Sequence, residues 1–162
     1  MKLTNEQIIS AANGIVRTEQ NELGLELHRF TREQEGFFYK THPLFCRESF
    51  FNGYFGRNCR TCAGVTLDFI CDAKVFEIKF SQTEYAKSLK ERIYLFDLYV
   101  DNKLVESYKT ESEIVYKASG EKQRFTLHFP YYAFPIITSV KLEDATVFLP
   151  QKRQVDILFL GD

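Results

Sequence analysis

Residues 64 to 80, GVTLDFICDAKVFEIKF, decide the fold class of this chain. Apolar and polar side chains alternate along both halves of the stretch, which is the two-residue period of a strand with one buried face. The apolar positions on the two sides of a turn at residues 72–74 are Val65, Leu67, Phe69, Cys71, Phe76, Ile78 and Phe80. The pattern predicts a β-hairpin with these residues in the core. The outward positions would then be Thr66, Asp68, Glu77 and Lys79.

Further strand signals recur at short intervals along the chain. A second hairpin is predicted to join residues 92–100 to residues 103–108 through Asp101-Asn102. Residues 92–100 have apolar side chains at both odd and even positions, so this strand should be central and covered on both faces. Three more strands are predicted at residues 113–117, 124–129 and 136–142.

Helical signals are short. The first predicted helix covers residues 4–12 and is capped by Thr4 or Asn5. The second covers residues 31–39, where Thr31 and Gln34 have the spacing of a capping box. Many short strands with turns between them indicate a mostly all-β fold, a jelly-roll-like β-sandwich with one or two short helices.

Composition and charge limit the classes of partner that this chain is expected to bind. Of the 162 residues, 44% are hydrophobic and 15% aromatic, which suits pleated, half-buried surfaces. Lys and Arg total 21 against 22 for Asp and Glu, so the net charge of -1 gives no electrostatic attraction for a nucleic acid or an anionic membrane. With no signal-like or membrane-spanning apolar run, we expect a cytoplasmic protein with neither nucleic-acid nor membrane partners.

The pattern changes near residue 150. Residues 155–160, VDILFL, are almost continuously apolar, which is typical of a parallel strand buried on both faces, and Gly161-Asp162 follow. The preceding residues 149–154, LPQKRQ, are polar and contain a proline. We therefore expect a sandwich domain over residues 1–149, and a linker with the first strand of a truncated α/β domain over residues 150–162.

The end of the chain resembles a known enzyme family. Residues 157–162, ILFLGD, are similar to the first block of the SGNH, or GDSL, hydrolases, in which the strand leads into Gly-Asp-Ser. Residues 27–30, 57–65, 67–69 and 72–73 resemble the β-sandwich domain that precedes the catalytic domain in some SGNH esterases. One departure is Cys62, which stands where that pattern more often has a hydroxyl residue, so no polar role is carried over to it.

The resemblance implies a role and a partner. The parent would be a serine ester hydrolase, an acyl esterase similar to certain bacterial carbohydrate deacetylases, and the sandwich would position or line its catalytic cleft. Its partner would be its own C-terminal catalytic domain, its ligand a carbohydrate or an acyl ester, and no cofactor would be needed. The nucleophile would lie beyond Asp162, so Gly161 and Asp162 are a motif remnant and this fragment alone would not be an enzyme.

The four cysteines raise two other possibilities, a zinc site and a Cys/His nucleophile. Cys59 and Cys62 have the spacing of zinc ligands, with Cys46 and Cys71 nearby, but the alternation turns Cys71 inward. A Cys/His nucleophile is a second alternative, although the three histidines lie far apart in the sequence. The expected state is reduced, mostly buried thiols and no metal.

Residues 50–60, FFNGYFGRNCR, concentrate aromatic residues, glycines and arginines. Candidates for a ligand-facing or interdomain surface are Tyr54, Phe55, Arg57 and Asn58. The alternative is that the phenylalanines of this stretch fill the core, and the same choice applies to residues 131–135. The loop also supports an alternative function, that of a stand-alone carbohydrate-binding or protein-interaction module.

Overall fold

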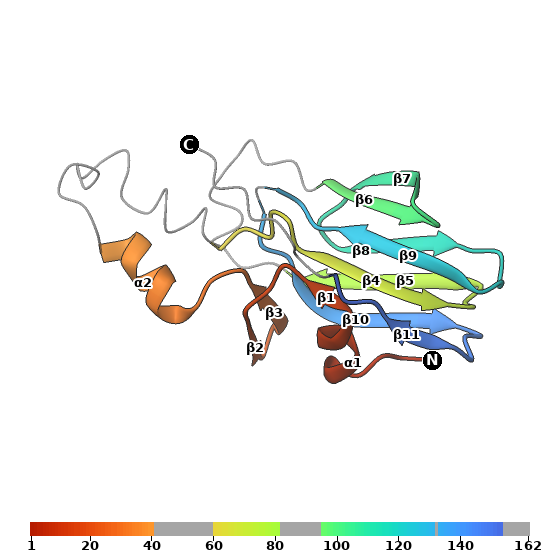
Figure 1. Cartoon of the computed structure of the whole chain (residues 1–162), viewed down its shortest axis with the longest axis horizontal. Helices are drawn as coiled ribbons and strands as arrows, with labels where there is room; N and C mark the ends of the chain where they lie inside the picture. Colours follow the sequence, from red (N-terminus) through yellow and green to blue (C-terminus); the bar gives the residue numbers. More distant parts are fainter. Residues whose placement is uncertain (41–59, 82–94, 132, 154–162) are drawn as a thin grey trace.

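Two antiparallel β-sheets stack as a sandwich (Figure 1). The computed structural model describes residues 1–40, 60–81, 95–131 and 133–153. Within them, the elements are α1 (Asn5–Ala11), β1 (Ala12–Asn13), β2 (Arg17–Asn21), β3 (Gly24–His28), α2 (Arg32–Lys40), β4 (Thr66–Cys71), β5 (Val75–Ser81), β6 (Leu95–Val100), β7 (Lys103–Lys109), β8 (Glu113–Lys117), β9 (Gln123–His128), β10 (Ile136–Glu143) and β11 (Phe148–Pro150). The mostly all-β prediction is confirmed.

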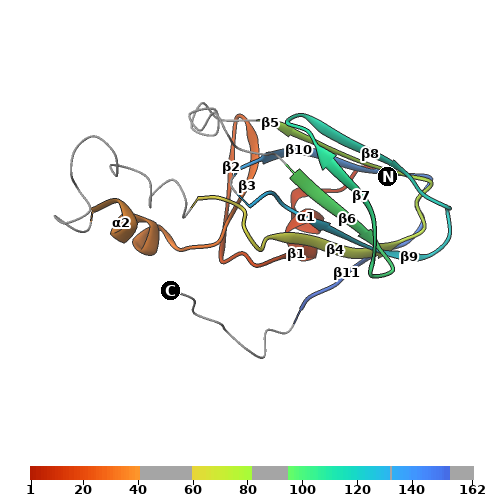
Figure 2. The ribbon, with the colours of Figure 1, turned by 90° about the horizontal axis from the view of Figure 1, so that it is seen from above.

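The strand order is that of a jelly roll. One sheet runs β2-β3-β10-β5-β8 and the other β1-β4-β9-β6-β7, and β11 pairs with β4 beside β1. Figure 2 shows β5 and β10 in one layer and β4 and β11 in the other. If only β3 to β10 are counted, the strands lie in the order 3-10-5-8 in one sheet and 4-9-6-7 in the other. This is the arrangement of the two interleaved Greek keys of a jelly roll.

The hairpin predicted over residues 64–80 is wrong. β4 pairs with β9, β1 and β11, whereas β5 pairs with β10 and β8, so the two strands belong to different sheets. Residues 72–74 carry the chain from one sheet to the other, and the Phe69 and Phe76 rings meet across the core with centroids 5.7 Å apart. Alternation reports which face of a strand is buried. Two strands that face each other across a core have the same alternation as two that pair.

The second predicted hairpin is confirmed. β6 pairs with β7 through Asp101 and Asn102, whose φ angles of 49° and 63° are those of a type I′ turn. The expectation that β6 is covered on both faces is wrong for its described residues. β6 lies between β9 and β7, yet Phe96 and Leu98 are buried while Leu95 is 40% exposed.

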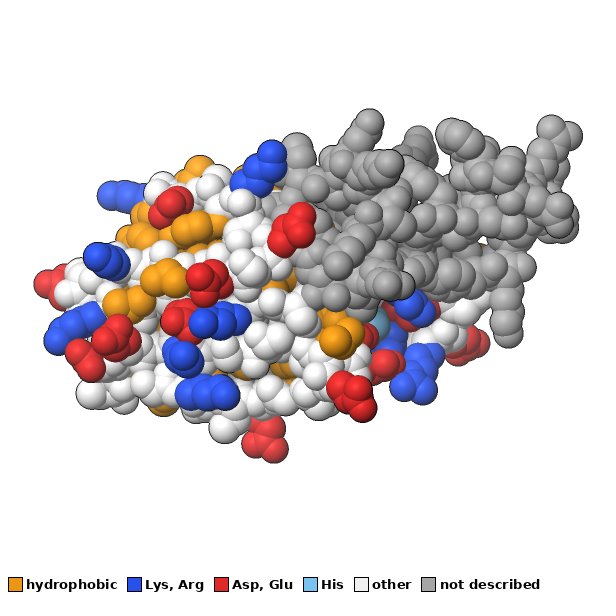
Figure 3. Space-filling model, turned by 180° about the vertical axis from the view of Figure 1, so that it is seen from behind, with side chains coloured by type: hydrophobic (Ala, Val, Ile, Leu, Met, Phe, Trp, Pro, Cys, Tyr) orange, Lys and Arg blue, Asp and Glu red, His pale blue; other side chains and the backbone are white. Residues whose placement is uncertain are grey.

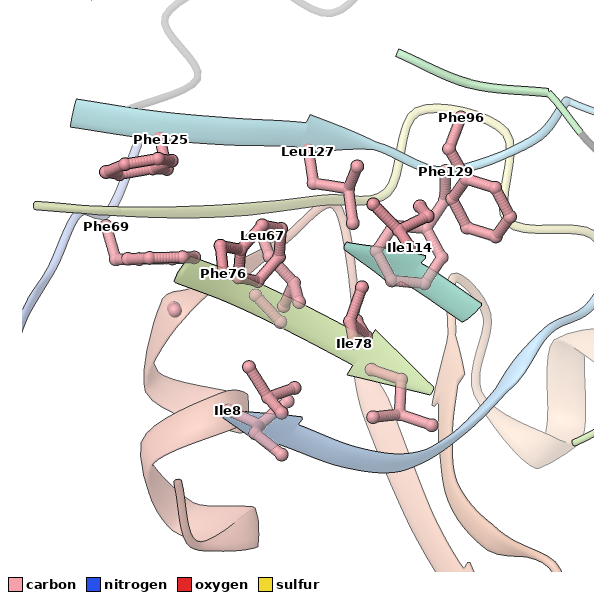
Figure 4. Packing of buried hydrophobic residues seen from close by; sticks show 14 of the residues in the cluster. Ile8, Leu67, Phe69, Phe76, Ile78, Phe96, Ile114, Phe125, Leu127 and Phe129 are labelled. Atoms are coloured by element: carbon pink, nitrogen blue, oxygen red, sulfur yellow. The ribbon is translucent and has the colours of Figure 1, made fainter. Parts of the chain in front are cut away.

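Aromatic rings fill the space between the sheets (Figure 4). Phe69 stacks on Phe125 within its own sheet, with centroids 5.7 Å apart, and Phe80 stacks on Phe96 of the opposite sheet at 4.6 Å. The buried Ile8 of α1 points into the same cluster. Each sheet therefore buries one face against the other.

Both short helices begin with capping boxes, of which the one at Thr31 and Gln34 was predicted. At α1 the Gln7 amide donates to Thr4 Oγ1 at 3.2 Å, and the Thr4 amide donates to the Gln7 side chain at 2.9 Å, so Thr4 rather than Asn5 is the cap. Thr31 and Gln34 make the same exchange at the start of α2. Among the described residues, neither helix has the length and apolar character needed to cross a bilayer.

The first part of the expected linker is attached to the sandwich. β11 pairs with the edge of β4, and the Gln151 amide continues that pairing by donating to the Asp68 carbonyl at 2.8 Å. The predicted strand at 155–160, with Gly161 and Asp162, lies outside the described residues. The boundary at residue 150 stays a prediction.

Candidate functional site

The largest assembly of charged side chains surrounds His28, at the end of β3. Leu25 and Leu27 point into the core, so the alternation of β3 turns Glu26 and His28 to the other side. Arg17 and Glu19 lie opposite them on β2 and share that side. Glu35 of α2 and the Phe134 ring lie against His28, which is only 4% exposed.

Both ring nitrogens of His28 meet carboxylates. Nδ1 lies 3.0 Å from Glu35 Oε1 on α2, and Nε2 lies 2.9 Å from Glu26 Oε2 on β3. The Arg17 guanidinium also lies 2.9 Å from Nδ1, and it can only donate. A neutral ring therefore accepts from Arg17 at Nδ1 and donates to Glu26 from Nε2, whereas a protonated ring can donate to both carboxylates. The ring also packs against Phe134, with centroids 5.2 Å apart.

Arginines complete the network. Arg17 lies 2.8 Å from Glu35 Oε1 and also pairs with Glu19, to which Arg32 Nε binds at 3.0 Å. Arg60 Nε lies 3.9 Å from the other oxygen of Glu35. We call the whole set the His28 cluster: Arg17, Glu19, Glu26, His28, Arg32, Glu35 and Arg60. Figure 3 shows histidine among acidic and basic side chains at one end of the described surface.

The His28 cluster lines a hollow of about 480 Å³. Ligand atoms of Glu19, Glu26 and His28 lie within 4.8 Å of one another, which is close enough to share a metal ion. However, Glu19 already binds two guanidinium groups, and the His28 Nε2 already contacts Glu26. A cation would have to displace these partners, so the arrangement fits an internally neutralised ion network better than a metal centre.

The cluster does not form a catalytic base. A general base needs one ring nitrogen directed at the proton that it removes, and both nitrogens of His28 face carboxylates. Within the described ranges, no serine, threonine or cysteine side chain is hydrogen-bonded to His28. The contacts of the cluster join Glu35 of α2 to Arg17 and His28 of the β2–β3 hairpin, and Arg60 lies at the limit of an ion pair with Glu35.

The two described cysteines are inert thiols. Cys71 points into the core, as predicted, and burial raises its pKa to about 11. Cys62 is fully buried, its Sγ lies 3.9 Å from the Leu27 carbonyl oxygen, and burial raises its pKa to about 12. A thiol with so high a pKa is protonated near neutral pH and is a poor nucleophile. Cys46 and Cys59 lie outside the described residues.

The predicted ligand-facing residues Tyr54, Phe55, Arg57 and Asn58 also lie outside the described residues. Residues 131–135 were predicted either to fill the core or to form a ligand-facing or interdomain surface. Phe134 is buried in the core, whereas Tyr131 is 68% exposed. Sequence reasoning missed the His28 cluster. The polar alternation of residues 24–28 was a usable signal for its hairpin, but nothing local indicated that Glu35 would reach His28.

Comparison with known proteins shows the fold. No family model and no curated protein matches this sequence. Among solved structures, the salicylyl-acyltransferase SsfX3 from a tetracycline biosynthetic pathway is similar, with a TM-score of 0.63 and 16% sequence identity. The alignment covers 87% of this chain and 39% of that protein. This chain therefore corresponds in fold to less than half of an acyltransferase.

Proposed function

We propose that this chain is the accessory β-sandwich domain of an SGNH-type serine ester hydrolase, in which it positions or lines the catalytic cleft. The observation that carries the proposal is the partial correspondence with SsfX3: a jelly roll of this form makes up 39% of a protein named for acyl transfer. The remaining length of that protein leaves room for a separate catalytic part.

The resemblance of residues 157–162 and the name of the structural neighbour both concern acyl chemistry. Residues 157–162 resemble the strand that delivers the nucleophilic serine of an ester hydrolase. A serine hydrolase passes its acyl group to water through an acyl-enzyme, and an acyltransferase of the same type passes it to another acceptor. The resemblance at the end of the chain and the name of the structural neighbour are both compatible with acyl transfer, which supports the proposal.

The described residues support an accessory rather than a catalytic role. His28 is committed to two carboxylates, and both described thiols are buried. The His28 cluster instead joins Glu35 of α2 to Arg17 and His28 of the β2–β3 hairpin.

The test compares this 162-residue chain with the product of the whole open reading frame, using p-nitrophenyl acetate. We expect serine to follow Asp162, the longer protein to hydrolyse the ester, and the 162-residue chain to be inactive. Replacing that serine with alanine should abolish the activity while leaving the unfolding temperature unchanged. An active 162-residue chain, or a longer protein without esterase activity, would count against the proposal.

The competing function is sugar binding by a stand-alone module. It predicts saturable binding when the 162-residue chain is titrated with a panel of oligosaccharides, and loss of that binding in Tyr54→Ala and Phe55→Ala. Sugar binding in a protein that has no esterase activity in its full-length form would favour this reading. Absence of binding together with esterase activity would remove it.

A further inference from the structure

The buried part of the His28 cluster has balanced charge only when His28 is protonated. The side chains of Arg17, Glu26, His28 and Glu35 are 17%, 13%, 4% and 8% exposed, whereas those of the other three members are at least 32% exposed. In the buried part, two carboxylates therefore face one guanidinium. A proton on His28 balances them, and an unbalanced charge is costly where water is largely excluded.

The nitrogen Nδ1 of His28 has a partner for each protonation state. Arg17 Nη2 of β2 lies 2.9 Å from it, and Glu35 Oε1 of α2 lies 3.0 Å from it. Without a proton, Nδ1 accepts from Arg17 and turns its lone pair to the Glu35 oxygen. With a proton, Nδ1 donates to Glu35, and Arg17 remains 2.8 Å from the same oxygen. Protonation therefore moves the hydrogen bond of Nδ1 from the hairpin to the helix.

The other ring nitrogen does not change its partner. Nε2 lies 2.9 Å from Glu26 Oε2 of β3 and donates to it in both states. The ring also meets Phe134, which carries no charge, and Glu19 of β2, whose carboxylate has an oxygen within 4.8 Å and is paired with Arg17. Among the described residues, Glu35 is the charged group that α2 turns to the ring. A proton at Nδ1 therefore acts on the attachment of α2.

From this geometry we propose that His28 is a pH-sensitive clasp, which holds α2 to the β2–β3 hairpin when the ring is protonated. His28 lines the hollow of about 480 Å³, through which water can deliver the proton. Closing α2 gives the Nδ1–H an acceptor, so closing and proton uptake favour each other. The clasp is closed at low pH and loosens as the pH rises and the proton leaves. It needs no downstream domain, so its test is separate from that of the proposed function.

The test measures hydrogen-exchange protection of the α2 amides from roughly pH 5 to 8, the range in which histidines titrate, after correction for the intrinsic exchange rate at each pH. EDTA is present throughout, so that no metal ion shares the carboxylates. The protonation of the His28 ring is followed by NMR in the same samples. One variant is His28→Gln, whose side chain takes up no proton in this range. The matched control is His128→Gln, at a histidine on β9 that lies outside the His28 cluster.

In wild type and in His128→Gln, we expect the protection of the α2 amides to fall by about tenfold or more as the His28 ring loses its proton, because a charge-assisted hydrogen bond is lost. Amides of β4 and β9 should keep their protection. In His28→Gln, the protection of α2 should be low and independent of pH. If that variant does not fold, Glu35→Gln serves in its place, since it removes the charged acceptor and leaves the ring free to titrate.

Three results would overturn the clasp. The first is α2 protection that stays constant or rises while the His28 ring loses its proton. The second is a ring that keeps one protonation state over the whole pH range. The third is an equal fall of α2 protection in wild type and in His28→Gln, which would assign the pH dependence to another group.

Discussion

Asp68 shows how a single carboxylate can be buried without becoming neutral. Burial pushes its pKa upward, but the hydrogen bonds and charges of Arg124 and Arg153 outweigh that effect, so the pKa of Asp68 lies below its ordinary value. A group whose pKa is lower in the folded state stabilises the fold above its ordinary pKa of 3.8, and this contribution is lost as the pH falls below that value.

Asp68→Asn should therefore lower the free energy of unfolding near neutral pH by about 1 to 3 kcal/mol, because two arginines lose a charged acceptor. The difference from wild type should shrink as the pH falls below 3.8. The measurement is urea unfolding across that pH range. Asp144→Asn is the control, since Asp144 and its partner Lys74 are both well exposed and a surface pair contributes at most about 1 kcal/mol. Parallel curves for wild type and Asp68→Asn would show that the Asp68 carboxylate contributes nothing to this dependence.

Gly24 fixes the approach of the β2–β3 hairpin to β10. Its φ of 138° is unfavourable for other residues, and a Cβ at this position would overlap the carbonyl oxygen of Ile137. Gly64 also has a positive φ, of 79°, but a Cβ there would meet nothing within 4 Å. Gly24 therefore combines the less favourable φ with a steric overlap that Gly64 lacks.

We expect Gly24→Ala to cost about 1 to 3 kcal/mol more than Gly64→Ala, because Gly24 has the less favourable φ and the alanine Cβ there would overlap β10. Thermal and urea unfolding of the two variants measure the difference. Equal costs would mean that β10 can move away from the hairpin without loss.

At the scale of the element, α2 depends on the sandwich for its place. It has nine residues, which is too short for a stable isolated helix. Its Glu35 is buried against His28 and Arg17, whereas its Glu33 is exposed. Among the described side chains of α2, Glu35 is thus attached to the sandwich through the His28 cluster.

Glu35→Gln should loosen α2 without unfolding the sandwich. Hydrogen exchange of the α2 amides should accelerate by about tenfold or more, since a buried charged acceptor contributes about 1 to 3 kcal/mol. Amides of β4 and β9 should exchange as in wild type, and Glu33→Gln should change neither set. Faster exchange throughout the molecule would show instead that the cluster supports the whole fold.

At the scale of the whole molecule, the aromatic core holds the two sheets together. Phe69 is 1% exposed and contacts Phe125 in its own sheet and Phe76 in the other. Its removal leaves a cavity that rigid sheets cannot close completely. The free energy of unfolding of a domain this size is about 5 to 15 kcal/mol, so one such cavity is a large fraction of it.

Phe69→Ala should lower the free energy of unfolding by about 3 to 5 kcal/mol, measured by urea denaturation. Phe37→Ala, at a position 63% exposed, should change it by about 0.5 kcal/mol or less. A small effect at Phe69 would mean that the neighbouring rings close the cavity.

Local patterns in the sequence determined the class of the fold and most of its parts. The alternation of β8, β9 and β10, the Asp101-Asn102 turn and the capping box at Thr31 and Gln34 were readable because each depends on residues close together in the chain. Strand pairing was not readable at β4 and β5, because one burial pattern serves a hairpin and a crossover between sheets equally well. Only the tertiary structure decided that Phe69 faces Phe76 across the core, that Glu35 meets His28, and that Asp68 holds Arg124 and Arg153. These contacts join segments whose meeting is set by topology, and no local periodicity encodes it.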